Sequence, residues 1–370
     1  MTTKIIYPDY HKSSVSLSNS ICKHFHIPTK HQTLESLDAY LNKGYQHVVL
    51  MLFDGLGSKI LTQHLPADRF LHKHKVDDIS AVFPSATVIA TTSITTGKNP
   101  SEHGWLGWFM YVKSLDKIVT TYFNTVKGTD EEVADYHVIQ SEFPNETIID
   151  AINKMGNAKA YWYSPFEQML YDQYKLDDTF DQIAKLCKDN EKAFFYIYNT
   201  EPDNLMHQHG VDDVCITQKI EWINAKTEQL ARSLEDTLII VTADHGHINA
   251  TPIFLEEYPQ LQKLLLRETS IEPRATNFFI KEGMQGSFVC LFNQLFGKDF
   301  KLFTKQEVLD LQLFGSGNQH DKFESCLGDF LAVAITNKYI MDKYTKNPMK
   351  GIHGGLTEEE MMIPLIIIET

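Results

Sequence analysis

The sequence contains little cysteine and has a deficit of positive charge. Five cysteines occur in 370 residues, and none are spaced as C-x-x-C. This scattered, odd number argues against a disulfide framework or a structural zinc site. Lysine and arginine number 34 against 48 acidic residues, which gives a formal net charge of -14. Because sequence-independent binding of nucleic acid needs excess positive charge, we expect no nucleic-acid polymer as a partner.

Long apolar runs are also missing. No stretch of about 18 apolar residues occurs, so the sequence predicts no transmembrane helix. Residues 1–20 contain no apolar segment typical of a signal peptide. We therefore expect a cytoplasmic protein without a membrane partner. Hydrophobic residues still make up 43% of the chain, enough for a sizeable buried core.

Four short apolar runs, each followed by polar residues, cover residues 48–53, 194–198, 238–241 and 364–368. Runs of this length and composition are typical of parallel strands buried on both faces. Helix-like stretches lie between them at 147–155 and 213–234. This alternation predicts an α/β fold with a doubly wound, mostly parallel sheet and helices on both faces.

The segment 256–347 has a different pattern. It contains strand-like runs at 276–281 and 287–292, followed by a helical stretch at 305–311. We predict that it forms a smaller α+β cap. The cap would be inserted into a catalytic core made of residues 1–255 and 348–370.

Aspartate and histidine follow the apolar runs. Asp54 closes the first run, and Asp244 and His245 follow the third. Ligands of doubly wound sheets bind at the carboxyl ends of strands, which makes these residues candidate metal ligands. Each aspartate on its own also fits a simpler role, Asp54 in a turn and Asp244 as a helix cap.

Two further motifs contribute candidates. If a helix begins near Pro202, the spacing of four places Asp203 and His207 on one helical face. The alternative is a helix-capping aspartate and a surface histidine. His209 lies off this face. His353 stands in a glycine-flanked loop, where a lone histidine is usually not a ligand.

Taken together, these residues form a mixed set of three carboxylates and three imidazoles: Asp54, Asp203, His207, Asp244, His245 and His353. Divided in two, the set provides two metal sites. Two cations about 3.5–4 Å apart clamp the attacking and leaving oxygens in phosphoryl transfer. Mixed nitrogen and oxygen ligands favour Zn²⁺, with Mn²⁺ or iron as alternatives, over Mg²⁺ or Ca²⁺.

A nucleophile is expected in the hydroxyl-rich segment 81–97. A helix is predicted from about Ala86 to a C-terminal glycine at Gly97. Thr87 would then lie in the first turn, where free N–H groups and the helix dipole favour negative charge. Ser85 is the expected N-cap and the competing hydroxyl. The later threonines of the segment are expected to pack or to bond to the helix backbone.

These motifs, in this order, resemble the type I phosphodiesterase/nucleotide pyrophosphatase family of the alkaline phosphatase superfamily. The resemblance spans about residues 46–369. It rests on the strand-Asp, the hydroxyl ten residues before Gly97, Pro-x-x-His-Gly at 100–104, Glu-Pro-Asp-x-x-x-His, Ala-Asp-His-Gly and the final His-Gly-Gly. It implies one zinc at Asp203, His207 and His353, and another at Asp54, Asp244 and His245. Thr87 stands at the family's nucleophile position and would bridge toward the second ion.

The resemblance implies a two-metal hydrolase that cleaves phosphodiester or pyrophosphate bonds through a threonyl-phosphate. Its substrate would be a small-molecule phosphate ester, with nucleotides among the candidates. A phosphomonoesterase, phosphonate hydrolase or phosphomutase of the superfamily is the alternative, and a non-catalytic metal-binding protein is a further one. A sulfatase is disfavoured because neither C-x-P-x-R nor S-x-P-x-R occurs.

One departure from the family concerns substrate binding. Many nucleotide pyrophosphatases have an asparagine shortly after the His-Gly, but His103-Gly104 is followed here by aromatic residues. Trp105, Trp108, Phe109 and Tyr111 either stack on a base or belong to the core. Of the four arginines only Arg274, in the predicted cap, lies near the motifs. The scarcity of cationic clamps favours diesters or pyrophosphates over monoester dianions.

Overall fold

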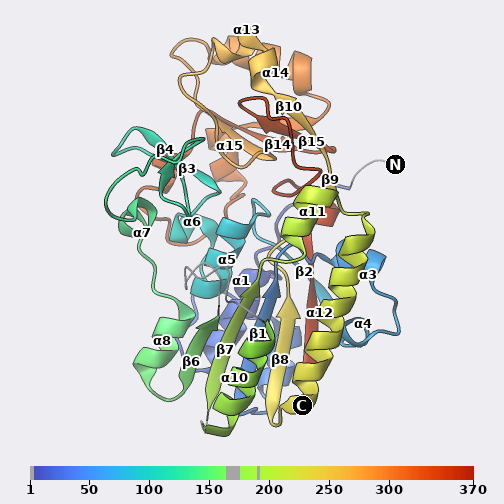
Figure 1. Ribbon diagram of the computed structural model, residues 1–370. Helices are drawn as coiled ribbons and strands as arrows, with labels where there is room; N and C mark the ends of the chain where they lie inside the picture. Colours follow the sequence, from blue (N-terminus) through green and yellow to red (C-terminus); the bar gives the residue numbers. More distant parts are fainter. Residues whose placement is uncertain (1–3, 164–175, 190–191) are drawn as a thin grey trace.

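The computed structural model describes residues 4–163, 176–189 and 192–370 (Figure 1). In this part of the chain, the core sheet consists, in spatial order, of β2 (Lys75–Ser80), β17 (Met362–Glu369), β8 (Thr237–Thr242), β1 (His47–Phe53), β7 (Ala193–Asn199) and β6 (Lys159–Tyr163). β1 runs parallel to β7 and β8, and β6 runs parallel to β7. The predicted mostly parallel sheet is confirmed.

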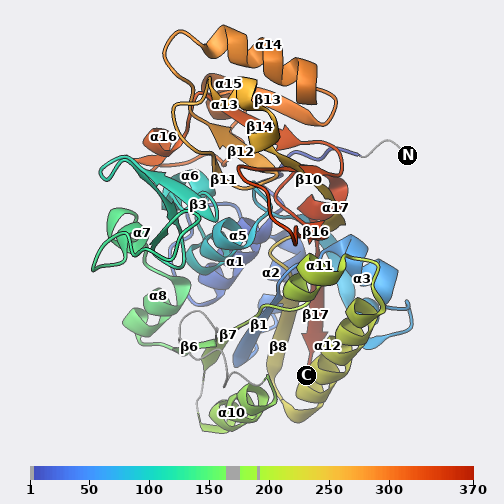
Figure 2. The same ribbon diagram turned by 45° about the horizontal axis from the view of Figure 1, so that its top comes forward.

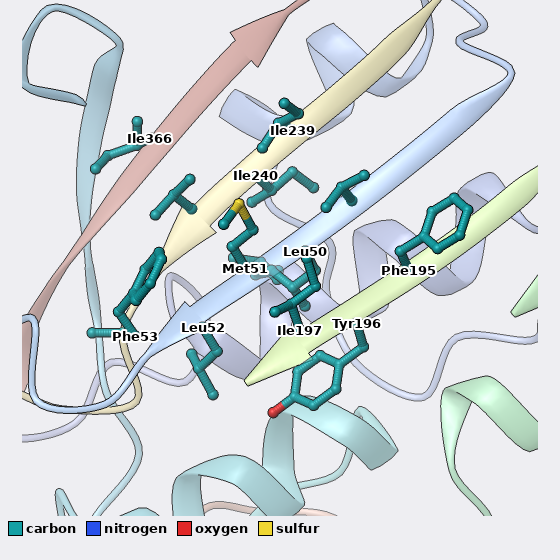
Figure 3. Close-up of a cluster of buried hydrophobic side chains, with 14 of the residues drawn as sticks. Leu50, Met51, Leu52, Phe53, Phe195, Tyr196, Ile197, Ile239, Ile240 and Ile366 are labelled. Carbon is teal, nitrogen blue, oxygen red and sulfur yellow. The ribbon is translucent and has the colours of Figure 1, made fainter. Parts of the chain in front are cut away.

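The centre of this sheet is apolar on both faces. All seven residues of β1 are buried, including His47 at its start. Successive side chains of a strand point to opposite faces, so both faces must be covered. Figure 3 shows Leu50 and Met51 of β1 packed beside Ile197 of β7 and Ile240 of β8. The apolar runs of the sequence therefore correspond to strands buried on both sides.

Helices cover both faces of the core sheet. One group consists of α1 (Ser14–His24), α2 (Glu35–Leu41), α5 (Thr87–Thr96) and α8 (Ile148–Met155). The other consists of α3 (Ser58–His64), α4 (Phe70–Lys73), α10 (Leu176–Asp189) and α12 (Val214–Ser233). Figure 1 shows α10 and α12 in front of the sheet. The helices predicted at 147–155 and 213–234 are confirmed, with Thr147 and Asp213 as their N-caps.

The last strand runs against the expected direction. The apolar run at 364–368 was predicted to be parallel, but β17 is antiparallel to both β8 and β2. A strand buried on both faces has the same composition in either direction, so the sequence could not distinguish them. As a result, β17 begins at the edge where β1, β7 and β8 end. Residues that precede β17 therefore reach the same edge as residues that follow the parallel strands.

A second sheet lies above this edge in Figure 1. Among the described residues its strands are, in order, β13 (Phe300–Thr304), β14 (Phe330–Ala334), β12 (Ala275–Phe278), β11 (Ser270–Ile271), β3 (Phe109–Val112), β4 (Lys117–Thr120) and β5 (Thr125–Val126). It thus combines strands from the predicted cap with residues 109–126, which the sequence assigned to the core. Ile271 pairs with Phe109 where the two segments join. The division at 256 and 347 stays a prediction.

Helices of the second region lie around this sheet: α13 (Pro259–Gln262), α14 (Gln285–Phe296), α15 (Lys305–Asp310) and α16 (Phe323–Cys326). The predicted helix at 305–311 is confirmed. The strand predicted at 287–292 is wrong, because these residues belong to α14. Phe288, Phe292 and Phe296 are all buried, and their spacing of four is that of one helical face. The sequence contains this helical spacing of four, because Phe296 continues the pattern of Phe288 and Phe292 beyond the apolar run 287–292.

Short elements complete the region next to the sheet edge: α6 (Pro100–His103), α7 (Val138–Glu142), β9 (Ile248–Asn249), β10 (Thr251–Phe254), η1 (Leu255–Glu257), β15 (Lys338–Met341), β16 (Gly351–Ile352), α11 (Asp203–His209) and α17 (Glu358–Met361). β9 pairs with β16, and β10 pairs with β15. Figure 2 shows α11 and β16 close to the ends of the core strands. None of the helices within the described ranges is long and apolar enough to cross a membrane.

Candidate metal centre and nucleophile

The six predicted ligands and Thr87 meet at the edge where the core strands end. Asp54 follows β1, Asp203 begins α11 just after β7, and Asp244 and His245 follow β8. Thr87 begins α5, in the segment that leaves β2. His353 lies between β16 and α17 and precedes β17, so the antiparallel direction of that strand brings it to the same edge.

Gly55 lets α11 approach the end of β1. Its φ of 73° is in the left-handed region that favours glycine. A Cβ at this position would lie 2.8 Å from Met206 Cε and 3.1 Å from Asp203 Cβ. A larger residue would therefore push α11 away from Asp54. The Asp-Gly of the sequence is thus a close-packed turn as well as a strand end.

One half of the site, which we call the carboxylate-rich group, consists of Asp54, Thr87, Asp244 and His245. His245 Nε2 lies 3.3 Å from Asp54 Oδ1, 3.5 Å from Asp244 Oδ2 and 3.3 Å from Thr87 Oγ1. Thr87 Oγ1 is also 3.5 Å from Asp54 Oδ2. Asp244 Oδ1 accepts hydrogen bonds from the N–H groups of Gly55 and His245. These bonds fix its other oxygen toward the group.

The other half, the imidazole-rich group, consists of Asp203, His207, His247 and His353. Each residue offers one ligand atom, and these atoms all lie within 4.8 Å of one another. His207 Nε2 is 3.1 Å from Asp203 Oδ2, which confirms that their spacing of four places them on one helical face. His353 Nε2 lies 3.6 Å from Asp203 Oδ1. The halves adjoin, since ligand atoms of Asp54, Asp203 and His245 also lie within 4.8 Å of one another.

Backbone carbonyls orient the three predicted histidines. The Nδ1 atoms of His207, His245 and His353 lie 2.9–3.0 Å from the carbonyl oxygens of Gly351, Gly246 and Ser85, respectively. An Nδ1–H that donates to a carbonyl leaves Nε2 with a free lone pair. This arrangement is usual for histidines that bind metal ions.

Burial and neighbouring charges strongly shift the pKa values of the ionisable side chains at the site. Burial, reinforced by neighbouring carboxylates, raises the pKa of Asp54 and of Asp244 well above the usual value. Burial opposes ionisation of Asp203 too, but the surrounding histidines hold its pKa well below the usual value. The pKa of His207 is raised to about 9, because the charge of Asp203 outweighs burial. Cations at this position would favour the ionised form of every carboxylate.

The donor atoms fit divalent cations. Within the described residues, Asp54 Oδ1, Asp203 Oδ1 and Asp244 Oδ2 are buried and have no hydrogen-bond partner. Buried carboxylate oxygens without partners are costly, and coordination to a cation is one way to compensate them. Each group combines carboxylate with imidazole, which suits zinc or manganese. The set of residues therefore fits a two-cation centre.

Thr87 is the first residue of α5, and Gly97 ends that helix in the left-handed conformation, as predicted. The prediction that Ser85 caps the helix is wrong. Ala86 is the N-cap residue, and the Ser85 hydroxyl donates instead to the Gly355 carbonyl at 2.9 Å. Ser85 thus connects the start of α5 to the loop that contains His353. Its hydroxyl points to that loop, whereas the Thr87 hydroxyl points to the carboxylate-rich group.

Arg274 is fully buried and occupied by internal partners. Its Nε and Nη2 donate to the two carboxylate oxygens of Glu360 at 2.6 and 2.7 Å. Its Nη1 donates to the carbonyls of Thr336 and Lys338. The Glu360 carboxylate also accepts from the Gly355 N–H. Arg274 therefore stabilises the loop next to His353 and is not placed to clamp a phosphate.

The aromatic residues after His103-Gly104 have different surroundings. Trp105 donates to the Phe143 carbonyl, and Tyr111 packs against Phe279 in a small buried cluster. Trp108 instead packs against Tyr122 and the half-exposed Phe123, with ring centroids 5.9 and 5.8 Å away. The Tyr122 hydroxyl lies 2.8 Å from Thr91 Oγ1, one helical turn after Thr87.

Three residues at the site were missed by the sequence analysis. His247 belongs to the imidazole-rich group, and only its position two residues after His245 hinted at this. The Tyr198 hydroxyl donates to Asp54 Oδ2 from the end of β7. Glu272 is buried in the second region and accepts from the Trp108 N–H at 2.7 Å. Burial raises the pKa of Glu272 to about 7, and no local sequence pattern marked it.

Comparison with known proteins agrees with this architecture. The chain matches the type I phosphodiesterase / nucleotide pyrophosphatase family over residues 48–356, and it belongs to this family of the alkaline phosphatase superfamily. A comparison with curated protein sequences finds no significant match.

Solved structures with the same fold include two kinds of protein. Murine ectonucleotide pyrophosphatase/phosphodiesterase 5, as an inactive form in complex with AMP, has a TM-score of 0.66 at 19% identity, covering 86% of this chain and 87% of that one. Phosphonoacetate hydrolase from Sinorhizobium meliloti, in complex with phosphonoformate, has a TM-score of 0.64 at 16% identity, covering 88% and 90%. At these identities the likeness shows the fold.

Proposed function

We propose that the protein is a two-metal hydrolase that cleaves phosphodiester or pyrophosphate bonds through a phosphorylated Thr87. The observation that carries this proposal is the position of Thr87 Oγ1. It lies 3.3 Å from His245 Nε2 and 3.5 Å from Asp54 Oδ2, at the N-terminus of a helix. This is the one hydroxyl of the segment 81–97 in contact with the carboxylate-rich group within the described structure.

Two divalent cations, zinc or manganese, would be held by Asp54, Asp244 and His245 and by Asp203, His207 and His353. When bound, they supply positive charge that favours an ionised hydroxyl and neutralises the phosphoryl oxygens. Free N–H groups at the start of α5 add to this effect, because the N-terminus of a helix favours negative charge. His245, His207 and His353 are pre-oriented for such ions by the carbonyls that their Nδ1 atoms contact.

The reaction would proceed in two displacements. The Thr87 hydroxyl gives up its proton to solvent as its Oγ1 attacks phosphorus, the bond from phosphorus to the leaving oxygen breaks, and that oxygen takes up a proton from solvent. A water molecule then attacks the threonyl-phosphate, and Thr87 Oγ1 leaves and regains its proton. The two steps release the alcohol or phosphate first and the phosphorylated product second.

The surroundings favour a singly charged phosphoryl group. Arg274 is engaged by Glu360, and the buried Glu272 adds negative charge when it ionises. A monoester dianion usually needs an additional cation, whereas a diester carries one negative charge. A nucleotide is a candidate substrate because Trp108 and the half-exposed Phe123 form an aromatic pair on which a base could stack. Among structures of the same fold, murine ectonucleotide pyrophosphatase/phosphodiesterase 5 is in complex with AMP in its inactive form.

A phosphonate hydrolase is the second candidate, because phosphonoacetate hydrolase has the same fold. The paired assay that separates the candidates uses bis-p-nitrophenyl phosphate, p-nitrophenyl phosphate, the p-nitrophenyl ester of thymidine monophosphate and phosphonoacetate, each with Zn²⁺ or Mn²⁺. We expect the two diesters to be hydrolysed fastest, and chelation to abolish turnover until metal is restored. Faster release of phosphate from phosphonoacetate would contradict the diester proposal.

The role of Thr87 can be tested directly. Thr87→Ala should lower kcat at least about 1000-fold, as expected when a nucleophile is removed. Thr87→Ser should retain part of the activity because the hydroxyl remains. Thr95→Ala is the matched control, since Thr95 is a buried threonine of the same helix whose hydroxyl bonds to the Thr91 carbonyl. Rapid quenching and peptide mass spectrometry should locate phosphate on Thr87. Phosphate on Ser85, or full activity of Thr87→Ala, would overturn the assignment.

A further inference from the structure

His247 occupies a position that the six predicted ligands do not explain. It lies between Gly246 and β9 and is 1% exposed. Its Nε2 atom is 2.9 Å from Asp203 Oδ1, which is closer than His207 or His353 comes to that carboxylate. Its ring centroid is 4.8 Å from that of His207 and 5.3 Å from that of His353. The imidazole therefore points into the middle of the imidazole-rich group.

Neither ring nitrogen of His247 is satisfied by the protein. Within the residues described, both Nδ1 and Nε2 are buried and have no hydrogen bond of acceptable geometry. His207 and His353 differ in this respect, because the Nδ1 of each is held by a backbone carbonyl. A histidine without partners in the interior loses its bonds to water and receives no bonds in return. A cation bound at the site would compensate this cost.

The backbone opposite His247 leaves room for its ring. A Cβ added at Gly351 would lie 3.0 Å from both Nδ1 and Cε1 of His247, which is closer than side chains normally approach. The carbonyl of the same glycine accepts from His207 Nδ1. Gly351 therefore positions one imidazole and admits the other. This arrangement explains how the ring fits but gives neither ring nitrogen a hydrogen bond.

We propose that His247 is a fourth protein ligand of the cation in the imidazole-rich group. The inference rests on the proposed function for the presence of a cation and adds a donor to the three that the family resemblance implies. Three imidazoles and one carboxylate form a donor set that suits zinc, iron or manganese. Catalytic zinc sites usually have three protein ligands and one open position. A fourth ligand would make this cation more tightly held and less open to substrate than its neighbour.

The test compares His247→Ala and the more conservative His247→Gln with His209→Ala. His209 is an exposed histidine of α11, two residues after His207 and outside the imidazole-rich group. Each protein is loaded with zinc and dialysed against increasing concentrations of a chelator, and bound zinc is measured by elemental analysis. We expect two zinc ions per wild-type chain, lost in two steps. In both His247 variants the later step should shift to at least about 10-fold lower chelator, while His209→Ala behaves as wild type.

A second measurement distinguishes a ligand from a residue that only positions others. With one equivalent of Co²⁺ bound to the wild-type protein, the proton spectrum should contain strongly shifted imidazole N–H signals from three coordinated histidines. One of these should disappear in His247→Gln. Because the wild-type spectrum alone reports the number of coordinated imidazoles, a variant that fails to fold does not prevent a decision. Two imidazoles in the wild type, or unchanged zinc retention in both variants, would overturn the role of His247.

The outcomes separate this inference from the proposed function. A wild-type protein that binds two cations but hydrolyses none of the phosphorus esters contradicts the proposed function, and the zinc and cobalt data still decide the role of His247. A wild-type protein that binds no zinc or cobalt overturns both. If the wild-type protein hydrolyses the phosphorus esters and the His247 variants retain zinc as the wild type does, only the role of His247 is overturned.

Discussion

The carboxylate-rich and imidazole-rich groups adjoin at one sheet edge but are built differently. Asp54 directly follows β1 and Asp244 lies two residues after β8, and these two strands are hydrogen-bonded to each other. His207 and His353 come from a short helix and a loop, and their rings are held by the carbonyls of Gly351 in β16 and of Ser85 before α5. The first group is therefore placed by the core sheet. The second depends on contacts between segments that are distant in sequence.

The chemistry of the two groups differs as well. The carboxylate-rich group has two carboxylates, one imidazole and the candidate nucleophile, whereas the imidazole-rich group has one carboxylate and three imidazoles. Nitrogen donors favour zinc and similar transition metals, and oxygen donors tolerate harder ions. The two cations should therefore differ in their affinity for the protein and in the substitutions that weaken their binding. Three further predictions test this difference, from the largest effect to the smallest.

The largest effect is expected from breaking the ion pair behind the imidazole-rich group. Glu360→Gln leaves Arg274 buried without its countercharge, and loss of one partner of a buried pair costs about 3–5 kcal/mol of unfolding free energy. The variant should also lose the cation of the imidazole-rich group first, because Glu360 accepts from Gly355 next to His353. Glu358→Gln is the control, since Glu358 forms an exposed pair with Lys4 that is worth at most about 1 kcal/mol.

The difference between wild type and Glu360→Gln should depend on pH. Burial alone would raise the pKa of Glu360, but the charge and hydrogen bonds of Arg274 hold it below the usual 4.5. The stabilisation is therefore present above pH 4.5 and is lost as pH falls through the lower, folded-state pKa. Urea unfolding at pH 7 and at successively lower pH measures it. A difference that stays constant down to the most acidic folded condition would contradict the ionic contribution of Glu360.

A smaller effect is expected at Glu272, which is influenced by both groups. Burial raises its pKa from 4.5 to about 7, and the nearby charges of His245, His207 and Asp203 modify this shift. In the metal-free protein, its ionisation therefore costs stability above pH 4.5, and the cost reaches its full size above pH 7. Glu272→Gln should raise the unfolding free energy at pH 8 by up to about 3 kcal/mol, and little at pH 4.

Adding zinc tests whether Glu272 responds to the charge bound in the two groups. Cations in both groups would favour the ionised form of Glu272, so the advantage of Glu272→Gln at pH 8 should shrink when zinc is bound. Thermal unfolding with and without zinc measures this change. An advantage of the same size with and without zinc would mean that Glu272 does not sense either group.

The smallest effect is expected at Tyr198, whose hydroxyl contacts Asp54 of the carboxylate-rich group. Its hydroxyl donates to Asp54, and burial together with the Asp54 charge raises the pKa of Tyr198 well above 10. Tyr198→Phe removes a hydrogen bond to a charged group, worth about 1.5 kcal/mol, which corresponds to roughly 10-fold in affinity. We expect Tyr198→Phe to lose the cation of the carboxylate-rich group at a lower chelator concentration than the wild type. The cation of the imidazole-rich group should be retained as in the wild type.

The control for this variant is Tyr111→Phe. Tyr111 also donates to a carboxylate, that of Asp116, but it lies in the second sheet away from both groups. Its removal should leave retention of both cations unchanged. If Tyr198→Phe weakens the binding of both cations equally, the two groups behave as one coupled site, and the proposed difference between them is wrong.

Local patterns in the sequence were sufficient for the elements that their own residues specify. The continuous apolar run at 48–53 predicted a strand buried on both faces, and Thr147 and Asp213 marked helix starts that the structure confirms. Asp203 and His207 were predicted on one helical face and lie 3.1 Å apart. These predictions succeed because periodicity and capping are properties of neighbouring residues.

Only the tertiary structure decided which distant segments meet. The antiparallel direction of β17 brings His353 to the sheet edge, and the pairing of Ile271 with Phe109 joins two distant segments into one second sheet. His247, Tyr198 and Glu272 reach the site through such long-range contacts. Strand direction and pairing are determined by packing across the whole fold, since a strand buried on both faces has the same local composition in either direction. The sequence by itself therefore determined the elements and most candidate ligands, and the fold determined their arrangement.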